Sequence, residues 1–325
     1  MFIEKRKNET MMKVSVLVPI YGVEKYIEQC AVSLFEQTYQ DLEYIFVDDC
    51  TPDKSVEVLQ QVMERYPQRK AMVRILRHDK NRGLGAARAT ALDAATGDYV
   101  LVVDSDDFVS TDAVERLCRR QQETDADIID AGYTRWVDGK AVEPTPPFTK
   151  SSTEYLKLML VQNTVEPHIW GRLMRKRLFT DHDINSIEGI NLAEDYAVVP
   201  RLLFFATRAT VDATLYFYRI NAESTFRGEI TEAQAMSIVN ANRVVYEFFV
   251  HHDTHNKYLC PLEIGMLKVY YTAVKAGISV NKMERITGFR PTFFYIKWCR
   301  ALFASHPGLM RKAYLVIKRL YRTWL

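Results

Sequence analysis

Residues 14–49 read VSVLVPIYGVEKYIEQCAVSLFEQTYQDLEYIFVDD. The stretch begins with a short β-branched run, Val14–Pro19, and ends with a second apolar run, Leu42–Val47. Between them, Glu24–Gln37 repeats its apolar residues at helical spacing. A strand, a helix and a second strand in this order form a βαβ unit, and such units predict a parallel sheet covered by helices.

The same alternation continues toward the C-terminus. We predict helices at Lys54–Arg65, Ala86–Ala95 and Thr111–Gln122, and strands at Met72–Leu76 and Tyr99–Val103. Ligands of such sheets bind beyond the carboxyl ends of the strands. The polar residues that follow each predicted strand are therefore the candidates for a site.

The second half of the chain is less regular. Ala126–Ala131 and residues 213–220 are predicted strands, Ser151–Val161 is a predicted helix, and the pattern is helical from about residue 230. The sequence therefore predicts an α/β domain followed by a helical C-terminal extension.

Composition limits the class of the protein. The five cysteines are scattered without a CxxC pair, which argues against a disulfide framework or a zinc site and for a reducing compartment. The N-terminal residues MFIEKRKNETMM lack the apolar stretch of a signal peptide, and no run approaches the roughly 18 apolar residues of a spanning helix. We therefore expect a cytoplasmic protein. Its formal net charge of +2 does not indicate a nucleic-acid partner.

The sharpest chemical signal, Asp104-Ser105-Asp106-Asp107, follows the predicted strand that ends at Val103. Three carboxylates within four residues repel one another, and this is costly beside a buried strand unless a cation is present. Carboxylate oxygens suit Mg²⁺ or Mn²⁺, which also take phosphate oxygens as ligands. The motif therefore indicates a metal ion that neutralises a diphosphate. The alternative is an acidic loop that caps the helix from Thr111.

Three other polar segments lie at the ends of predicted elements: Pro19-Ile20-Tyr21-Gly22, Asp48-Asp49, and Asn191-Leu192-Ala193-Glu194-Asp195-Tyr196. Each has a structural alternative. Tyr21 could be a packing aromatic, Asp49 could terminate its strand with an Asx-type turn, and Asp195 could be the N-cap of a helix at residues 196–206.

Residues 14–55, the segment NRGLGAARATALDAATGDYVLVVDSDD at 81–107 and the later Ala-Glu-Asp together resemble the family 2 glycosyltransferases. This is the large inverting family with the GT-A nucleotide-binding fold. The resemblance is close over about residues 13–110 and looser over 165–225. It implies a GT-A domain at 13–225, with a nucleotide-binding half at about 13–110 and an acceptor and base half at about 111–225. The helical extension then occupies residues 226–325.

The resemblance also implies roles for residues near the donor. Pro19 and Tyr21 match positions that flank the nucleotide base, and Asp49 matches the residue that accepts a hydrogen bond from it. Because a carboxylate pairs simply with N3–H of uracil, a UDP donor is favoured. Arg88 matches a basic position near the donor, where its partner would be phosphate or an acidic neighbour.

For the acidic motif, the resemblance makes Asp106 and Asp107 the pair that binds metal and diphosphate, with Asp104 as the first residue of a DxD pattern. Asp195 matches the catalytic base. The implied reaction is a single displacement with inversion, in which the base removes the proton of an acceptor hydroxyl and Mg²⁺ or Mn²⁺ stabilises the departing diphosphate. Acceptors in the family include polysaccharides, lipid carriers and proteins, so synthesis of a cell-surface polysaccharide or glycoconjugate is expected.

Rival interpretations remain. A non-catalytic nucleotide-sugar-binding or scaffold protein could have the same fold, although intact Asp106, Asp107 and Asp195 speak against it, and a hydrolase could use the same carboxylates. Gly83–Arg88 superficially resembles a dinucleotide fingerprint, but an arginine occupies its third small position. Three histidines near residue 253 are interpreted as a solvated helix face rather than as metal ligands: His251, His252 and His255.

The C-terminal tail, residues 286–325, contains eight Lys or Arg and no Asp or Glu. On a helical wheel of residues 311–324, five bases lie on one side and aromatic and aliphatic residues on the other. A basic, aromatic-rich amphipathic helix indicates an element that lies in an anionic membrane surface. We therefore expect peripheral attachment at the inner face of the plasma membrane. The alternative is a tail packed on the acidic body or on a dimer partner.

Overall fold

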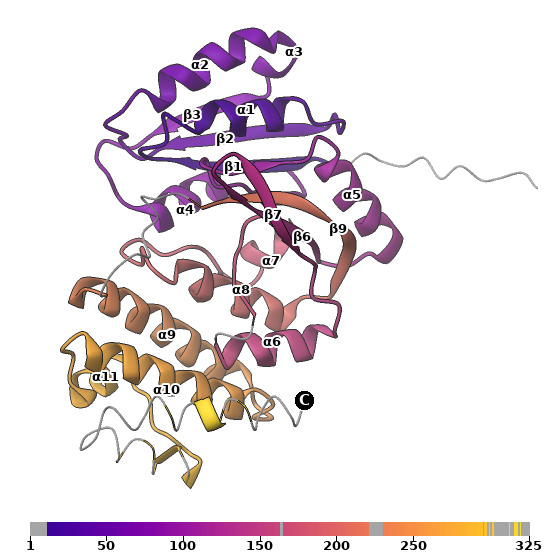
Figure 1. Ribbon diagram of the computed structural model, residues 1–325. Coiled ribbons are helices and arrows are strands. Elements are labelled where there is room, and N and C mark those ends of the chain that lie inside the picture. The colour runs from indigo at the N-terminus through magenta and orange to yellow at the C-terminus, as the bar shows by residue number, and fades with distance from the viewer. Residues whose placement is uncertain are drawn as a thin grey trace, which may run out of the picture.

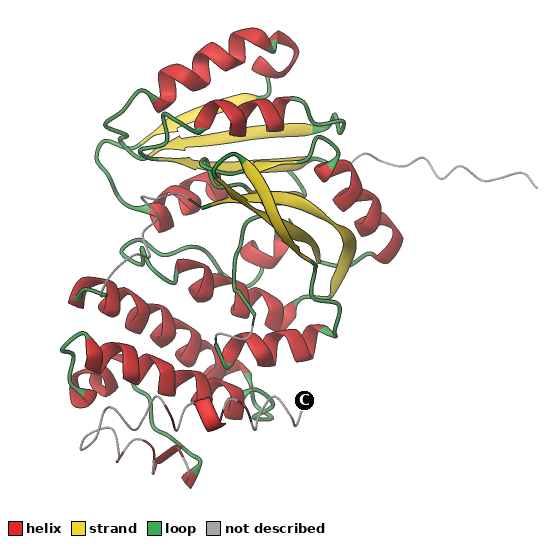
Figure 2. Cartoon of the chain, in the orientation of Figure 1, coloured by secondary structure: helices red, strands yellow, loops and turns green. Residues whose placement is uncertain are grey.

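The computed structural model describes residues 12–162, 165–220 and 230–294, together with residues 296–297, 299, 301, 312, 315–317 and 319. Within these residues the chain forms one mixed sheet with helices on both faces. A further layer of helices packs beneath the sheet in the view of Figure 1, and Figure 2 separates the strands from the helices by colour.

The first half of the chain alternates between strand and helix as predicted, apart from the short additional helix α3, and each predicted boundary lies within three residues of the observed one. Strands β1 to β4 are parallel and lie in the order β3-β2-β1-β4. The elements of this half are β1 Val14–Ile20, α1 Ile27–Phe35, β2 Leu42–Asp48, α2 Ser55–Arg65, α3 Pro67–Lys70, β3 Val73–Arg77, α4 Leu84–Ala94 and β4 Tyr99–Val102.

Burial on both faces explains why β1 is apolar at almost every position. Val14, Val16 and Val18 pack into one apolar cluster with α1, whereas Leu17 points to the opposite face and packs with Ala87 of α4. Side chains of a strand alternate between faces, and parallel sheets are covered on both, so such strands are nearly continuously hydrophobic.

The second half extends the same sheet through β4-β8-β6-β9-β5, with β7 paired to β6. β8 is antiparallel to both of its neighbours, and β5 is antiparallel to β9. The chain that leaves β4 is thereby placed against the end of β9. The elements are β5 Phe108–Val109, α5 Ala113–Thr124, β6 Ile128–Val137, β7 Lys140–Thr145, α6 Ser152–Leu160, β8 Leu173–Arg175, α7 Arg177–Thr180, α8 Glu194–Phe205 and β9 Arg208–Arg219.

Three further helices confirm the predicted helical extension: α9 Glu232–His252, α10 Leu259–Lys275 and α11 Val280–Thr287. They share an apolar cluster of their own, and Val245 and Phe249 of α9 also pack with Leu202 of α8. No helix in the described part of the chain is both long and apolar enough to cross a membrane. The predicted boundary at residue 225 lies outside the described residues.

The C-terminal tail divides into two parts. Phe289, Ile296 and Cys299 are buried in the α9–α11 cluster, whereas Phe294 is 81% exposed. The membrane interpretation of the tail stays a prediction. Most of the predicted amphipathic stretch at 311–324 lies outside the described residues, and Leu315 and Val316 within it are exposed.

Candidate active site

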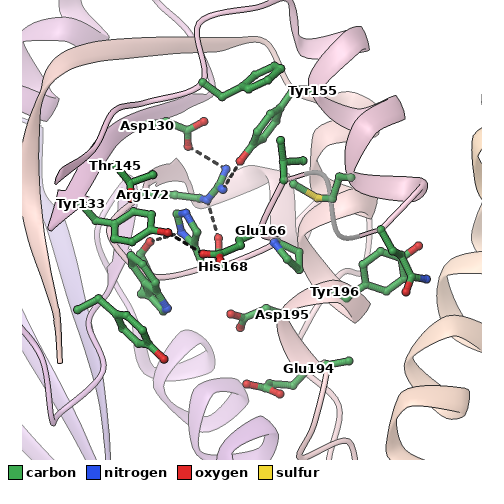
Figure 3. Close-up of a pocket in the computed structure, with 18 of the residues that line it drawn as sticks. Asp130, Tyr133, Thr145, Tyr155, Glu166, His168, Arg172, Glu194, Asp195 and Tyr196 are labelled. Carbon is green, nitrogen blue, oxygen red and sulfur yellow. Dashed lines mark hydrogen bonds and ion pairs between the residues drawn. The ribbon is translucent and has the colours of Figure 1, made fainter. Parts of the chain in front are cut away.

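A cavity of about 1380 Å³ lies between the sheet and the helical layer, beside the N-terminus of α8 (Figure 3). In Figure 3, Glu194 and Asp195 extend toward it from α8, and Tyr133 and His168 face it from the side of the sheet. Its walls are formed by residues 130–135, 145–150, 165–172 and 191–196, and by side chains of α6, α9 and α10.

The start of α8 sets the direction of these two carboxylates. Ala193 precedes the helix with φ at 64°, in the left-handed region that a residue with a Cβ rarely adopts. Ala193 is the N-cap residue, and no side chain caps this helix. The alternative that Asp195 is a helix cap is therefore wrong, and its carboxylate is directed elsewhere.

Arg88, at the middle of α4, joins three carboxylates from distant parts of the chain. Its guanidinium lies 2.6 Å from Asp195, 2.8 Å from Asp104 and 3.4 Å from Glu194. Burial alone would lower the pKa of Arg88, but the three carboxylates raise it above its usual range. Arg88 is therefore a permanent cation that is paired with acidic neighbours. Acidic neighbours are one of the two kinds of partner that the sequence predicts for it.

The single positive charge of Arg88 does not neutralise the negative charge of the three carboxylates. Burial raises the pKa of Glu194, and the adjacent Asp195 raises it further by repulsion. The pKa of Asp195 is also raised, first by burial and then by Asp104, although Arg88 and the backbone N–H of Ile169 oppose the shift. That N–H donates to Oδ2 of Asp195 at 3.2 Å. Asp195 is thus a partly buried carboxylate with a raised pKa at the wall of a cavity, which suits a general base.

The acidic motif after β4 is held by β9. Asp107 is almost fully buried and accepts hydrogen bonds from the Tyr216 hydroxyl and the Arg219 backbone N–H, each at 2.7 Å. The Arg219 side chain donates to the carbonyl of Asp106. Both oxygens of Asp107 therefore have protein partners, and each oxygen keeps a further acceptor position. Its predicted metal role stays a prediction.

The remaining carboxylates of the motif offer a donor set for a cation. Burial and repulsion from Asp104 raise the pKa of Asp106 to about 6, although the charges of Arg219 and Arg88 oppose the shift. Among the described residues, no three His, Cys, Asp or Glu side chains are grouped as a metal site. Mg²⁺ is commonly held by only one or two carboxylates together with phosphate oxygens, and Asp104 and Asp106 fit that pattern. The alternative that the acidic loop caps the next helix does not hold, because Asp112 is the N-cap residue of α5 and no side chain caps this helix.

The predicted nucleotide-binding residues lie at the carboxyl ends of β1 and β2. Pro19 is buried within β1, whereas Tyr21 is 51% exposed, so the alternative that Tyr21 is a packing aromatic is wrong. Several hydrogen bonds tie the chain after β1 to the chain after β2; for example, Gly22 N–H donates to Thr51, and Glu24 N–H donates to Asp53. An exposed ring therefore stands on a firmly held loop.

Asp49 organises a second loop. Its carboxylate contacts the His78 ring at 2.6 Å and accepts the backbone N–H groups of Arg82 and Gly83, each at 2.8 Å. The turn after β2 is instead made by Asp48, which accepts the N–H of Thr51, so the Asx-turn alternative for Asp49 is wrong. A carboxylate has about four acceptor positions, so Asp49 retains room for one more donor.

The two discounted motifs can also be placed. Gly83 has φ at 87°, and a Cβ there would lie 2.2 Å from Asn191, so the start of α4 is already covered by the chain before α8. This does not fit a dinucleotide loop, which must leave that space to a pyrophosphate. His251 and His252 are exposed at the end of α9, as expected for a solvated face.

The structure thus brings Arg88, Asp104 and Asp195 into direct contact and places Asp106 and Asp107 next to them. Pro19 in β1, Tyr21 just after β1 and Asp49 just after β2 lie along the same edge of the sheet. Sequence reasoning missed the Ile169 N–H and the Tyr216 hydroxyl. A backbone N–H leaves no signal in the sequence, but the aromatic pattern LYFY at 215–218 could have indicated the Tyr216 hydroxyl.

Comparison with known proteins agrees with this geometry. The family model described as Glycosyl transferase family 2 matches residues 15–182. The glycosyltransferase EpsJ of Bacillus subtilis is 30% identical over 269 residues, which cover 78% of this chain and 76% of that protein. The poly(ribitol-phosphate) beta-N-acetylglucosaminyltransferase TarS of Staphylococcus aureus is 28% identical over 269 residues, covering 76% of this chain and 45% of TarS.

Solved structures share the fold. Residues 1–349 of TarS in complex with UDP-GlcNAc match with a TM-score of 0.57 at 20% identity, over 96% of this chain and 92% of that one. The mannosyltransferase PcManGT of Pyrobaculum calidifontis, in complex with GDP-Man and Mn²⁺, matches with a TM-score of 0.53 at 14% identity, over 97% of this chain and 88% of that one. Together with the topology, these matches establish the predicted GT-A fold.

Proposed function

Because this chain belongs to glycosyl transferase family 2, we propose that it moves a sugar from a nucleoside diphosphate to an acceptor hydroxyl with inversion. One observation carries the proposal: the guanidinium of Arg88 holds Asp195, at the cavity wall, together with Asp104, at the start of the acidic motif. A base and a diphosphate site that share one cation are adjacent, as a single displacement requires.

Asp195 is the proposed base. Arg88 occupies one of its oxygens and the Ile169 N–H the other, so the carboxylate is fixed in orientation while its remaining lone pairs face the cavity. A raised pKa brings a carboxylate nearer to the pH at which it works and so makes it a better proton acceptor. The acceptor hydroxyl gives its proton to Asp195 as its oxygen attacks the sugar from the face opposite the diphosphate.

UDP is the favoured nucleotide. The exposed ring of Tyr21 offers a face for the base, and Asp49 offers an acceptor for uracil N3–H, with Pro19 beside them. TarS binds UDP-GlcNAc, which supports this choice, whereas PcManGT binds GDP-Man. The sugar itself is not assigned.

Asp104 and Asp106 are the proposed holders of Mg²⁺ or Mn²⁺, with Asp107 beside them. PcManGT was solved with Mn²⁺, and carboxylate oxygens suit both ions. When bound, the ion supplies positive charge against the diphosphate leaving group. Asp107 supports the loop through Tyr216 and Arg219 and so keeps Asp106 in place.

The acceptor is proposed to be a polysaccharide or lipid-linked glycan. A cavity of about 1380 Å³ exceeds the size of most small-molecule pockets, which suits an extended acceptor. The poly(ribitol-phosphate) substrate in the name of TarS supports a cell-surface polymer. The basic residues after 301 are proposed to bring the enzyme to the cytoplasmic face of an anionic membrane, where such acceptors are made.

A panel of nucleotide sugars tests the proposal. A true donor raises the melting temperature with Mn²⁺, because a ligand of the folded state stabilises it. Product analysis with and without acceptor then separates the classes: transfer supports the proposal, free sugar in both samples indicates a hydrolase, and binding without turnover indicates a non-catalytic protein.

A further inference from the structure

The segment His168–Arg172 runs along the cavity and into β8 (Figure 3). It supplies the Ile169 N–H that donates to Asp195 Oδ2. Within the described part of the chain, this N–H and the Arg88 guanidinium donate hydrogen bonds to the carboxylate. The orientation of Asp195 therefore depends on where this segment holds its backbone.

Arg172 holds that backbone. Its Nε donates to the carbonyl of His168 at 2.6 Å, one guanidinium nitrogen lies 2.8 Å from Asp130, and the other donates to the Tyr155 hydroxyl at 2.6 Å. Figure 3 draws these three contacts around the guanidinium. The side chain is 1% exposed and spans from β6 to α6. Because all three contacts are directional and buried, the segment has little freedom to shift.

A second arginine shares the same anchor without touching the segment. Arg208 lies 2.8 Å from the other oxygen of Asp130 and donates to the carbonyls of Phe148 and Lys150. It too is buried, and its guanidinium lies over the Tyr155 ring. Arg208 therefore resembles Arg172 in charge, burial and anchor, but its hydrogen bonds go to Asp130 and to the carbonyls of Phe148 and Lys150 rather than to residues 168–172.

We propose that Arg172 is a positioning residue for Asp195: through the His168 carbonyl it fixes the Ile169 N–H, and this N–H fixes the carboxylate that accepts the proton. The proposal rests on the proposed function for its effect on rate. Arg172 has no role in binding donor or metal, since its nitrogens all have protein partners.

Several charged groups act on Asp195, and Arg172 is distinct among them. Arg88 contacts it directly, Glu194 is its neighbour in α8, and Asp104 faces it across Arg88. His168 is half-buried, and desolvation followed by the charge of Arg172 lowers its pKa, so it adds no positive charge. Loss of the Ile169 contact would remove a donor that favours the ionised carboxylate and would leave Asp195 free to rotate about its side chain.

The test compares Arg172→Lys with Arg208→Lys in the full-length protein. Both keep the positive charge beside Asp130, but only Arg172→Lys loses the contact to His168. A misplaced catalytic group costs up to about 100-fold. We expect Arg172→Lys to lower kcat about 10- to 100-fold with little change in KM for donor or acceptor, and to move the acid limb of the pH–rate profile to higher pH. Arg208→Lys should leave kcat within about twofold.

Three outcomes overturn the proposal. Equal losses of kcat in the two variants would mean that both arginines affect activity only by stabilising the fold around Asp130. An unchanged kcat in folded Arg172→Lys would remove the positioning role. A rise in acceptor KM alone would make Arg172 a contact of the acceptor. If Arg172→Lys does not fold, Tyr155→Phe loosens the same guanidinium while keeping its bond to His168, and a smaller fall in kcat with the same pH shift is then required.

A readout independent of turnover separates this proposal from the proposed function. Carbon-13 NMR of the Asp195 carboxyl, assigned by its loss in Asp195→Asn, follows its titration directly. We expect its pKa to rise in Arg172→Lys and to stay unchanged in Arg208→Lys. A wild-type protein without any transfer would contradict the proposed function, whereas an Asp195 titration that is the same in Arg172→Lys would contradict the positioning role.

Discussion

The guanidinium of Arg88 lies 2.6 Å from the carboxylate of Asp195, although the two residues are 107 positions apart in the sequence. This contact joins α4, in the nucleotide-binding half, to α8, in the half that carries the proposed base. Arg88 also reaches Asp104, so the two halves meet at one buried cation. Any change in Arg88 should therefore affect both fold and activity.

Arg88→Met tests this joint role. The substitution keeps the length of the side chain but leaves Asp104, Glu194 and Asp195 without their cation. Removing one partner from a buried ion pair typically costs about 3–5 kcal/mol, because the remaining charge is uncompensated. We expect a loss of this size in urea unfolding at neutral pH, together with loss of transfer. Arg82→Met is the control, because Arg82 forms an exposed pair with Glu188 and its removal should change stability little.

Asp195→Asn tests the base. The change is nearly isosteric and leaves the nucleotide-binding residues of β1 and β2 untouched, so donor affinity should be retained. A positioned base contributes about 10²–10⁴-fold, and we expect transfer to fall by that factor. Calorimetry of donor binding and a transfer assay measure the two effects separately. Transfer within a few-fold of wild type would show that Asp195 is not the base, and Glu194→Gln would then be the next variant to assay.

The pKa of Glu194 leads to a prediction about stability and pH. Its carboxyl has a raised pKa in the folded protein, so the folded state holds the proton more tightly than the unfolded state does. The stabilisation from this proton is complete below the ordinary value of 4.5 and is lost as the pH rises through the raised value. Glu194→Gln removes this dependence.

We therefore expect the melting temperature of Glu194→Gln, relative to wild type, to increase from about pH 5 to about pH 8. Chelator is present throughout, so that bound metal does not offset the charge. A difference that is constant with pH would mean that Glu194 is ionised over the whole range, paired with Arg88.

Much of this site could be predicted because its residues follow predicted strands. The strands at 14–20, 42–48 and 99–102 are buried on both faces, and their nearly continuous apolar sequence predicts their positions well. Once those strands are parallel, their carboxyl ends share one edge, so Tyr21, Asp49 and Asp104 are expected on that edge.

The partners of those residues could not be predicted in the same way. The Tyr216 hydroxyl reaches Asp107 across 109 positions, and which face of β9 carries it depends on the register with β5. β8 has only three residues, too few for a periodic pattern, yet it fixes the segment that supplies the Ile169 N–H. Short elements and backbone donors acquire their roles from tertiary packing alone.

The basic amphipathic pattern of the C-terminal tail predicts a membrane interaction, and a short deletion can test it. Because Ile296 and Cys299 are buried, the deletion must begin after residue 301; removing 286–325 would expose the α9–α11 core. Residues 302–325, which this deletion removes, contain all five Lys and Arg residues of the amphipathic stretch. Each of these can add about 1 kcal/mol of binding near an anionic surface.

We expect the full-length protein to sediment with anionic liposomes at low salt, and less so as salt screens the attraction. The chain ending at 301 should stay in the supernatant yet bind UDP normally. A full-length protein that ignores anionic vesicles at low salt would contradict the membrane role. A truncated chain that loses its cooperative unfolding would show that residues 302–325 are structural.

The acidic motif leads to the last prediction, because its two final carboxylates differ in their surroundings. Asp107 has both oxygens bonded to protein, at Tyr216 and Arg219, whereas the pKa of Asp106 is raised to about 6 by burial and by Asp104. Asp106→Asn should therefore remove a metal ligand while the contacts of Asp107 with Tyr216 and Arg219 stay in place. Asp107→Asn should break a supporting contact and lower stability.

Calorimetric titration of UDP with Mn²⁺ and with chelator separates these roles. For wild type we expect at least about a tenfold gain in UDP affinity with Mn²⁺, since the ion links carboxylates to phosphate oxygens. Asp106→Asn should lose this gain at unchanged melting temperature. Asp107→Asn should keep it at a lower melting temperature, because Asn cannot accept from both the Tyr216 hydroxyl and the Arg219 N–H as the carboxylate does. The reverse assignment of the two effects would make Asp107 the ligand, and equal wild-type affinity in chelator would exclude a metal requirement for UDP binding.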